Sequence, residues 1–499
     1  MMLAVPKAGQ AQQKVQIDHA NKLTYYERSG MKFRKLIGDV RLRQENARMR
    51  CDSAVQQLDS NLVKAYGNVR YREGDSLRLF GDSLRYDGRR RIAHIRGNVR
   101  LQDGSTTLRT DAITYREAQK TAFYDNGGII RDPENKLYSR AGTYFTESKQ
   151  AFFRDSVRLT NDNFTLEADT LQYSTAGRTA FFTGPTYIRS EENTIFCTSG
   201  YYNTIAGDAF FGPGSRLYGP RNRLTSDSLF YERPRGFARS RGYTTIYDSV
   251  ENVTLSGYYA ELYEQDTMAL VTDSAQALYP MEGDSLYLHA DTLRAMTDST
   301  GRRLLKAYFG VRIWSRQMQG VCDSLVFRGQ DTQLVMIRRP ALWQQQYQLT
   351  ADTIKMYLGP SRLDSVDFIQ NAFICGKEDT GKFNQIRGKD MRAYFRENAL
   401  RRIDVSGNGQ AVYYLKDEKS PGYIGVNRIE SSDVVVYLRN QELSQITFVR
   451  QPVATLYPLE QAPPPEIRLK GLNWRGDERP RNRLDIFSTP ALPLSRREQ

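Results

Sequence analysis

Apolar and polar residues alternate along most of this chain in a phrase that recurs about every 30 residues. The best copies read Leu-x-small-Asp-Ser/Thr-Leu/Ile-x-Tyr, as in Leu79 to Tyr86 and Leu108 to Tyr115. Alternation with a period of two predicts a half-buried β-strand. Because the phrase returns at fixed intervals, we interpret the chain as an array of tandem repeats.

The alternation slips by one residue at the aspartate of the phrase. Around Asp111, Leu108 and Thr110 are in phase before it, whereas Ile113 and Tyr115 are in phase after it. Such a slip turns the side chains to the other face unless the strand bends or bulges. The aspartate can also hydrogen-bond its own following backbone. We therefore expect a strand that leaves one sheet and enters a second, facing sheet.

A second bend signal, Gly-Asn/Asp-Val, occurs in the other half of the repeat at Gly38 to Val40, Gly67 to Val69 and Gly97 to Val99. Polar turns such as Asp87 to Arg90 separate the two phrases and indicate hairpins. Each repeat then reads as one long hairpin, bent in both arms. The predicted fold is all-β: an elongated open β-jellyroll of two facing antiparallel sheets, built from about 13 bent-hairpin repeats of roughly 30 residues.

The repeats set the expected boundaries. Residues 1–15 are interpreted as the remnant of an export signal or as disordered, because small residues at Ala8 to Ala11 resemble a cleavage site. Residues 16–458 are expected to form one continuous repeat array. Residues 459–499 are a Pro/Arg-rich extension, expected to be mobile or loosely docked.

Composition adds few sites for chemistry. The mean hydropathy of −0.61 and the lack of a long apolar run argue against a membrane-spanning helix. The four cysteines have no CxxC spacing and no histidine cluster, so we predict no metal and no cofactor. They are expected to be small buried residues, although a disulfide between distant repeats stays open.

One tetrapeptide raises the question of an enzyme. Gly-Asp-Ser-Leu, the nucleophile signature of a family of serine esterases, occurs at Gly74 to Leu77, Gly81 to Leu84 and Gly283 to Leu286. A nucleophilic serine needs a strand-to-helix turn and a positioned base. Here the tetrapeptide is instead one sequence variant of the repeated strand phrase. We predict that the protein is not an enzyme.

Charge favours an anionic partner. Lys and Arg number 71 against 57 acidic residues, a formal charge of +14, and one cluster comprises Arg85, Arg89, Arg90, Arg96 and Arg100. These arginines could simply keep the outer faces soluble and the edges unsticky. They could also attract a polyanion. No nucleic-acid fold signature is present, so we expect no nucleic acid; a phosphorylated glycolipid fits better, since arginine grips phosphates.

The opening Ile17 to Asn21, the Gly-Asn/Asp-Val phrases and the small-Asp-Ser/Thr-Leu-x-Tyr phrases resemble the OstA-like family over roughly Gln16 to Tyr457. The chain is similar in length to the long, Bacteroidetes-type members. The resemblance implies a periplasmic β-jellyroll protein of lipopolysaccharide transport, with or without attachment to inner- or outer-membrane machinery. It also implies an apolar groove for acyl chains between the sheets, and strand-to-strand pairing with other jellyroll proteins of that system.

These expectations assign residues. The in-phase apolar residues are predicted to line the lipid groove: Val40, Leu42, Val69, Tyr71, Leu84, Tyr86, Val99, Leu101, Ile113, Tyr115, Leu171 and Tyr173. The five clustered arginines are predicted to hold head groups at a basic rim. The edge near Ile17, Leu23 and Tyr25 is predicted to dock a partner. The alternative is a structural or adhesive surface β-solenoid without lipid, which antiparallel pairing would disfavour.

Overall fold

The computed structural model describes residues 14–488 apart from 192, 282, 360–361, 397–398, 417–421 and 440–441, so the interpreted export signal lies outside the described residues. The described residues form 41 strands and five short 3-10 helices, without an α-helix. None of these helices is long and apolar enough to cross a membrane. The chain divides into two compact units, Met1–Pro220 with Phe230–Pro234 (unit 1) and Arg221–Leu229 with Arg235–Gln499 (unit 2). Whether the repeats continue as one array across this division stays a prediction.

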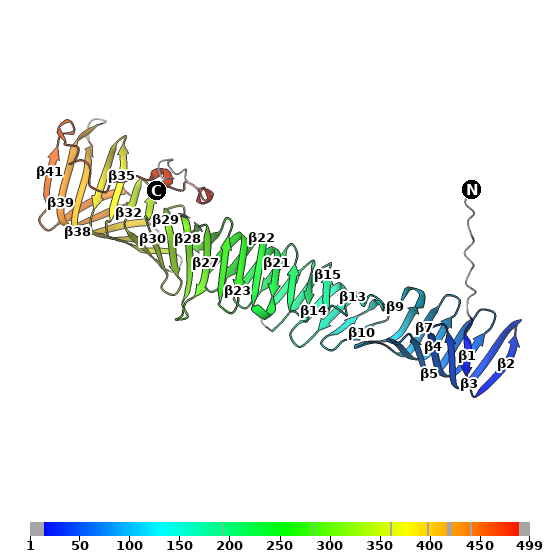
Figure 1. Cartoon of the computed structure of the whole chain (residues 1–499). Helices are drawn as coiled ribbons and strands as arrows, with labels where there is room; N and C mark the ends of the chain where they lie inside the picture. Colours follow the sequence, from blue (N-terminus) through cyan, green and yellow to red (C-terminus); the bar gives the residue numbers. More distant parts are fainter. Residues whose placement is uncertain are drawn as a thin grey trace, which may run out of the picture. The chain divides into compact units, whose positions relative to one another are not determined.

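Unit 1 is built from short and long antiparallel strands joined by tight turns (Figure 1). Its elements are β1 (Gln16–His19), β2 (Lys22–Arg28), β3 (Met31–Gln44), β4 (Ala47–Gln57), β5 (Leu62–Glu73), β6 (Leu77–Asp87), β7 (Ile92–Asp103), β8 (Thr106–Arg116), η1 (Glu117–Gln119), β9 (Thr121–Tyr124), β10 (Gly128–Arg131), β11 (Lys136–Ser139), β12 (Ala141–Phe145), β13 (Gln150–Thr160), β14 (Thr165–Ser174), β15 (Thr179–Phe182), β16 (Thr186–Arg189), β17 (Thr194–Cys197), β18 (Gly200–Asn203), β19 (Asp208–Phe211) and β20 (Ser215–Tyr218).

Unit 2 has the same kind of construction, and β21 and η2 lie at the boundary in the chain. The elements are β21 (Asn222–Glu232), η2 (Arg233–Arg235), β22 (Phe237–Asp248), β23 (Val253–Tyr263), β24 (Met268–Thr272), β25 (Gln276–Met281), β26 (Asp284–His289), β27 (Thr292–Thr297), β28 (Arg303–Trp314), β29 (Gln319–Arg328), β30 (Gln333–Ile337), β31 (Ala341–Gln344), β32 (Tyr347–Thr350), β33 (Thr353–Gly359), β34 (Arg362–Ile369), β35 (Phe373–Asp379), β36 (Lys382–Arg387), β37 (Asp390–Arg396), β38 (Ala399–Lys416), β39 (Tyr423–Arg439), β40 (Glu442–Val449), β41 (Val453–Tyr457), η3 (Leu459–Gln461), η4 (Gly476–Glu478) and η5 (Asp485–Phe487).

Each bent strand takes part in two ladders of hydrogen bonds. In β8, Thr107–Thr110 pair with β10, whereas Thr114–Arg116 pair with β9. The buried phase changes at the same place, since Leu108 is buried before the corner and Tyr115 after it. We call the ladder on the β10 side the first ladder and that on the β9 side the second ladder. The pairings of both ladders are antiparallel, which excludes the parallel β-helix form of the solenoid alternative.

Unit 2 repeats this division into ladders. Its first ladder includes β31, β32, β35, β36 and β41, and its second includes β30, β33, β34, β37 and β40. The long strands β38 and β39 belong to both, because their register shifts between Ser406 and Gly409. Side chains from the two ladders therefore converge on a common interior.

The two sequence phrases meet at one corner. The register between β6 and β7 shifts between Phe80 and Ser83, so the bulge predicted at the aspartate is present. Asn98 Nδ2 donates a 2.9 Å hydrogen bond to Asp82 Oδ2. Gly97 adopts φ +77°, and a Cβ there would lie 2.3 Å from the same oxygen. The predicted bond from Asp82 to its own backbone is thus replaced by a bond from the neighbouring strand.

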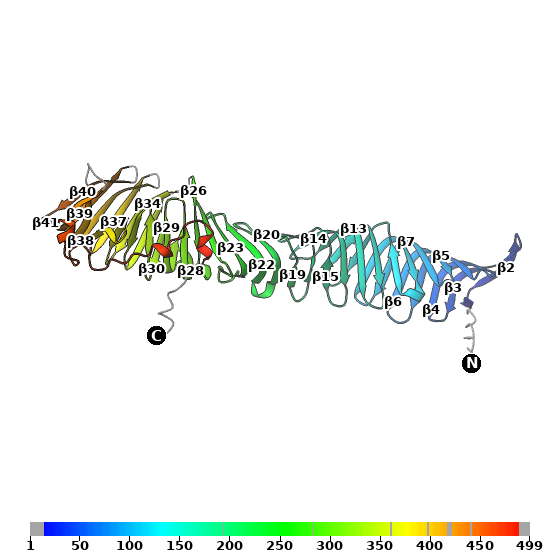
Figure 2. The ribbon, with the colours of Figure 1, turned by 90° about the horizontal axis from the view of Figure 1, so that it is seen from above.

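A C-terminal strap, residues 465–488, packs on the outer side of the first ladder of unit 2 (Figure 1, Figure 2). Its Leu469 is buried in a cluster with Phe373, Cys375 and Val412. The expectation of a mobile or loosely docked extension is wrong for these residues, because the outer face beneath them is apolar and needs a cover.

The strap crosses the strands along one row of paired residues, Gln319, Trp343, Gln348, Cys375 and Gln385. Each glutamine in this row bonds the strap. Gln385 donates to the Ile467 carbonyl at 3.0 Å and accepts from the Leu469 amide at 2.9 Å. Gln348 does the same with Asn473 and Arg475, both at 2.7 Å, and Gln319 accepts from Arg479 at 2.8 Å. The docking is therefore specific as well as apolar.

Candidate functional site

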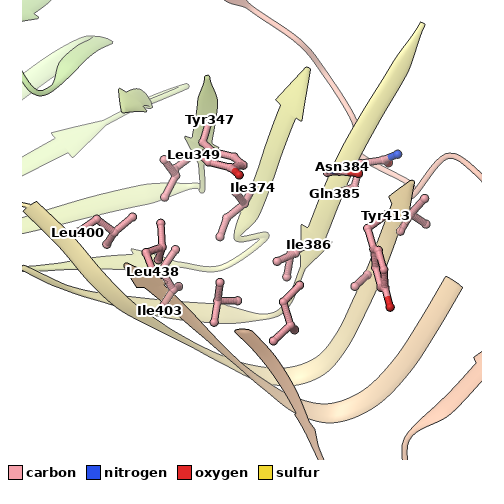
Figure 3. A pocket seen from close by; sticks show the side chains of 14 residues that line it. Tyr347, Leu349, Ile374, Asn384, Gln385, Ile386, Leu400, Ile403, Tyr413 and Leu438 are labelled. Atoms are coloured by element: carbon pink, nitrogen blue, oxygen red, sulfur yellow. The ribbon is translucent and has the colours of Figure 1, made fainter. Parts of the chain in front are cut away.

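An apolar cavity lies in unit 2 between the first and second ladders (Figure 3). Its empty space, counted together with the open solvent at its mouth, is about 620 Å³. The lining residues come from β32, β35, β36, β38, β39 and β40: Tyr347, Leu349, Ile374, Asn384, Gln385, Ile386, Leu400, Ile403, Ala411, Val412, Tyr413, Val436, Leu438 and Ile446. Most are aliphatic, so the wall offers hydrocarbon to whatever enters.

Strand alternation explains how β35 serves both the cavity and the strap. Ile374 points into the cavity, whereas its neighbours Phe373 and Cys375 point outward under Leu469. A strand buried on both faces carries a continuous apolar run, as this one does. The strap thus completes the wall from behind.

The polar side chains of the wall have partners of their own. Asn384 donates to Glu378 Oε1 at 2.6 Å, and the Tyr413 hydroxyl accepts from Asn427 at 2.8 Å. The Gln385 amide is bonded to the strap. Because these groups are satisfied, the cavity suits an apolar ligand rather than a charged one.

A second, smaller cavity lies elsewhere in unit 2, and its empty space together with open solvent is about 380 Å³. Three methionines, Met281, Met318 and Met356, contribute to its wall together with Phe395. Methionine side chains adapt to irregular shapes, so this cavity can change its form at low cost.

The twelve predicted groove residues, from Val40 to Tyr173, are all in unit 1 and all buried, with exposed fractions of 2% or less. Their inward phase is confirmed, and their contact with lipid stays a prediction. Sequence reasoning missed the lining of both cavities, which lie in unit 2. The repeat phrase is less regular in unit 2, so the sequence did not show which of its residues point inward.

Unit 1 carries a buried clasp that joins its two ladders. The Tyr144 hydroxyl, on β12 of the second ladder, donates a 2.9 Å hydrogen bond to Asp103 Oδ2 at the end of β7. Lys149 Nζ lies 2.5 Å from the same oxygen, and the Asp103 side chain is only 2% exposed. An acid at the end of one ladder is therefore held by a tyrosine of the other ladder and by a base in the turn that follows that tyrosine's strand.

The same clasp recurs on either side at intervals of about one repeat. The three sets are Glu73 with Tyr115 and Lys120, Asp103 with Tyr144 and Lys149, and Asp132 with Tyr173 and Arg178. In the last, the hydroxyl-to-carboxylate distance is 2.7 Å and the ion pair 2.6 Å. These clasps were not predicted, because the acid and the tyrosine of each lie 41 or 42 residues apart in the chain.

Burial shapes the ionisation of these groups. It raises the pKa of the Tyr115, Tyr144 and Tyr173 hydroxyls, with the neighbouring carboxylates adding to the rise, so each tyrosine stays a hydrogen-bond donor. Burial also pushes the pKa of Asp132 upward, but bonds from Tyr173 and the backbone, with the Arg178 charge, outweigh it and leave that pKa lowered. Glu117 has a raised pKa through burial and the nearby Glu73 carboxylate.

The five predicted rim arginines are all exposed. Arg85, Arg96 and Arg100 lie on the outer faces of β6 and β7, with Arg100 stacked 4.3 Å over Phe80. Arg89 and Arg90 lie in the turn after Asp87. Strand alternation turns the in-strand arginines away from the interior, and their contact with head groups stays a prediction.

The predicted docking edge has exposed side chains, and its strands pair with one neighbouring strand. Both β1 and β2 pair with β3, and Leu23 and Tyr25 are each 52% exposed. Ile17 is half-buried. At the other end of the repeats β41 pairs with β39, and Val453 is 68% exposed. Partner docking stays a prediction at either edge.

The Gly-Asp-Ser-Leu tetrapeptides and the four cysteines are structural parts of the strands and turns. Gly74 to Leu77 forms the turn into β6, Gly81 to Leu84 lies within β6, and Gly283 to Leu286 begins β26, so none occupies a strand-to-helix elbow. All four cysteines are buried free thiols, and burial raises the pKa of Cys51 to about 11.

Comparison with known proteins bears on this architecture. The sequence profile described as OstA-like protein matches residues 12–169 and 156–227. Over these residues the chain is similar to the OstA-like family. No curated protein matches the chain. A solved structure, LptH of Pseudomonas aeruginosa, the LptA-homologous periplasmic component of the lipopolysaccharide transport device, shares 21% identity over 20% of this chain and 76% of its own, with a TM-score of 0.19. The OstA-like match covers most of unit 1, and the apolar cavities lie in unit 2.

Proposed function

We propose that this OstA-like protein is a non-enzymatic periplasmic protein that binds lipopolysaccharide or a related anionic glycolipid and shields its acyl chains on the way to the outer membrane. The observation that carries the proposal is the apolar cavity between the ladders of unit 2. A mostly aliphatic lining with a few polar side chains is typical of sites for apolar small molecules. The OstA-like match supports the transport role.

An acyl chain is stabilised in this cavity because its methylene groups leave water for an apolar environment. Transfer of each methylene from water into an apolar wall is worth about 0.8 kcal/mol. The wall residues Leu349, Ile386 and Ile403 provide that environment, and the cavity opening leaves a polar head group in water. The formal charge of +14 favours an anionic head group at the surface.

In this proposal the ladders form an open β-jellyroll of about 13 repeats, and edge strands join the protein to other jellyroll proteins of the transport system. Open edges recruit a further strand unless they are blocked. The exposed strand β2 is the edge that the proposal assigns to a partner.

Filling the cavity tests the proposal. Ala411 lines the cavity and is buried, whereas Gln410 beside it bonds Glu430 on the outer side. Ala411→Phe should weaken binding of fluorescent lipid A by about tenfold, the loss expected when about two methylene contacts are excluded. Gln410→Phe introduces the same ring on the opposite face and should leave binding within about twofold. Equal affinities for both variants, with unchanged thermal transitions, would refute the site.

A further inference from the structure

We propose that the acid-tyrosine-base clasps seal the interior of unit 1 against lipid, so that acyl chains bind in unit 2 alone. This inference rests on the proposed function and deepens it. Under this proposal the two units are built from the same kind of strands but differ in role, because only unit 2 binds acyl chains.

The first observation is the repetition of the clasp at equivalent places. Asp103 at the end of a first-ladder strand meets Tyr144 of the second ladder and Lys149 in the turn that follows, and the sets at Glu73 and Asp132 repeat this arrangement. All three acids are almost fully buried. A chain of methylenes entering between the ladders would part these groups and leave a buried carboxylate without its partners, which is strongly unfavourable.

The second observation is a change in the repeat phrase. In unit 1 the eighth position of the phrase is tyrosine in the copies that end at Tyr86, Tyr115 and Tyr173, and glutamine in the copy that ends at Gln56. In unit 2 the same position holds Ala295, Phe327 and Met356, none of which has a hydroxyl to donate. The tyrosine that closes unit 1 is therefore missing from these repeats of unit 2.

The third observation is what occupies each interior. The predicted inward residues of unit 1 are buried, and the aromatic rings of Tyr71, Tyr86 and Tyr115 pack at centroid distances of 5.9 and 6.1 Å. In unit 2 the ladders leave the cavity lined by Leu349, Ile403 and neighbours. Aromatic side chains pack in the interior of unit 1, whereas unit 2 has an apolar cavity. This difference supports lipid binding in unit 2 and its exclusion from unit 1.

A photo-crosslinking experiment on the full chain tests it. p-Azidophenylalanine replaces either Phe153, a buried unit 1 residue outside the clasps, or Tyr413 in the cavity wall. After illumination with lipid A in detergent-free buffer, adducts are expected from the Tyr413 position only. Adducts from both positions would overturn the sealed interior while leaving lipid transport standing. Adducts from neither would refute the proposed function itself.

A second variant asks whether the clasp is the seal. In the Phe153 crosslinking chain, Asp103→Asn, Tyr144→Phe and Lys149→Met together remove the charges and the hydroxyl while keeping the side-chain volumes similar. This chain should now give lipid adducts at position 153, whereas the exposed change Lys136→Ala should not. A folded triple variant, shown by an unchanged circular dichroism spectrum, that stays free of adducts would overturn the proposal.

Discussion

Asn98 of β7 holds the carboxylate of Asp82 on β6 at 2.9 Å, and this bond ties the two recurring sequence phrases into one corner. The equivalent bonds of Asn68 to Asp52, at 2.8 Å, and of Asn371 to Asp352, at 2.9 Å, show that the device is reused in both units. The bend of each strand is thus fixed by its neighbour.

Substitutions at this corner should lower the free energy of unfolding by different amounts. Asn98→Ala should lower the free energy of unfolding by about 1 kcal/mol, the usual value of one hydrogen bond. Gly97→Ala should cost more, because φ +77° disfavours a side chain and its Cβ would meet Asp82 at 2.3 Å. Urea denaturation measures both, with the exposed Arg96→Ala as control. A Gly97 variant as stable as the control would show that the corner is tolerant.

The sequence predicted local features well, because they depend on neighbouring residues. The alternation around Asp111 gave the strand, the slip and the buried phase of Leu108 and Tyr115. Contacts between distant segments were missed, since nothing in the local pattern links Asp103 to Tyr144. The strap had a readable signal, however: Phe373 to Cys375 is a continuous apolar run, which is typical of a strand covered on both faces.

The strap should stabilise unit 2. Leu469→Asp places a charge against Phe373 and Val412 and should cost about 3 kcal/mol or more, with faster amide hydrogen exchange in β35. Lys470, the next residue, is exposed, so Lys470→Asp controls for the added charge. Exchange in β35 that is the same in both variants would contradict the packing role.

Acid should weaken the clasp at Asp132. Its pKa is lowered below the ordinary value of 3.8 in the folded protein, so the unfolded chain takes up the proton first as the pH falls. The contribution to stability is full well above pH 4 and is lost as the pH drops through the folded pKa. Asp132→Asn should be less stable than wild type at pH 7, and the gap should narrow toward pH 3. The exposed change Asp162→Asn serves as control. A gap that stays constant with pH would show that Asp132 gains nothing from its charge.

The two open edges should differ in partner docking. Photo-crosslinkers at Leu23 and Val453 test this, since both side chains are more than half exposed. We expect partner adducts from Leu23, because Pro452 and Pro458 flank β41 and cannot donate to a ladder. Adducts from Val453 alone, or from neither position in cells, would contradict the edge assignment.

The central claim is that this chain carries the acyl chains of an anionic glycolipid in the cavity of unit 2. Mass spectrometry of lipid co-purified with the full chain from the cells that produce it tests that claim most directly. The account predicts a phosphorylated, multiply acylated glycolipid in the wild type and a reduced amount with Ala411→Phe, while Gln410→Phe retains it. Recovery of no lipid from any of the three, or equal recovery from all three, would contradict it.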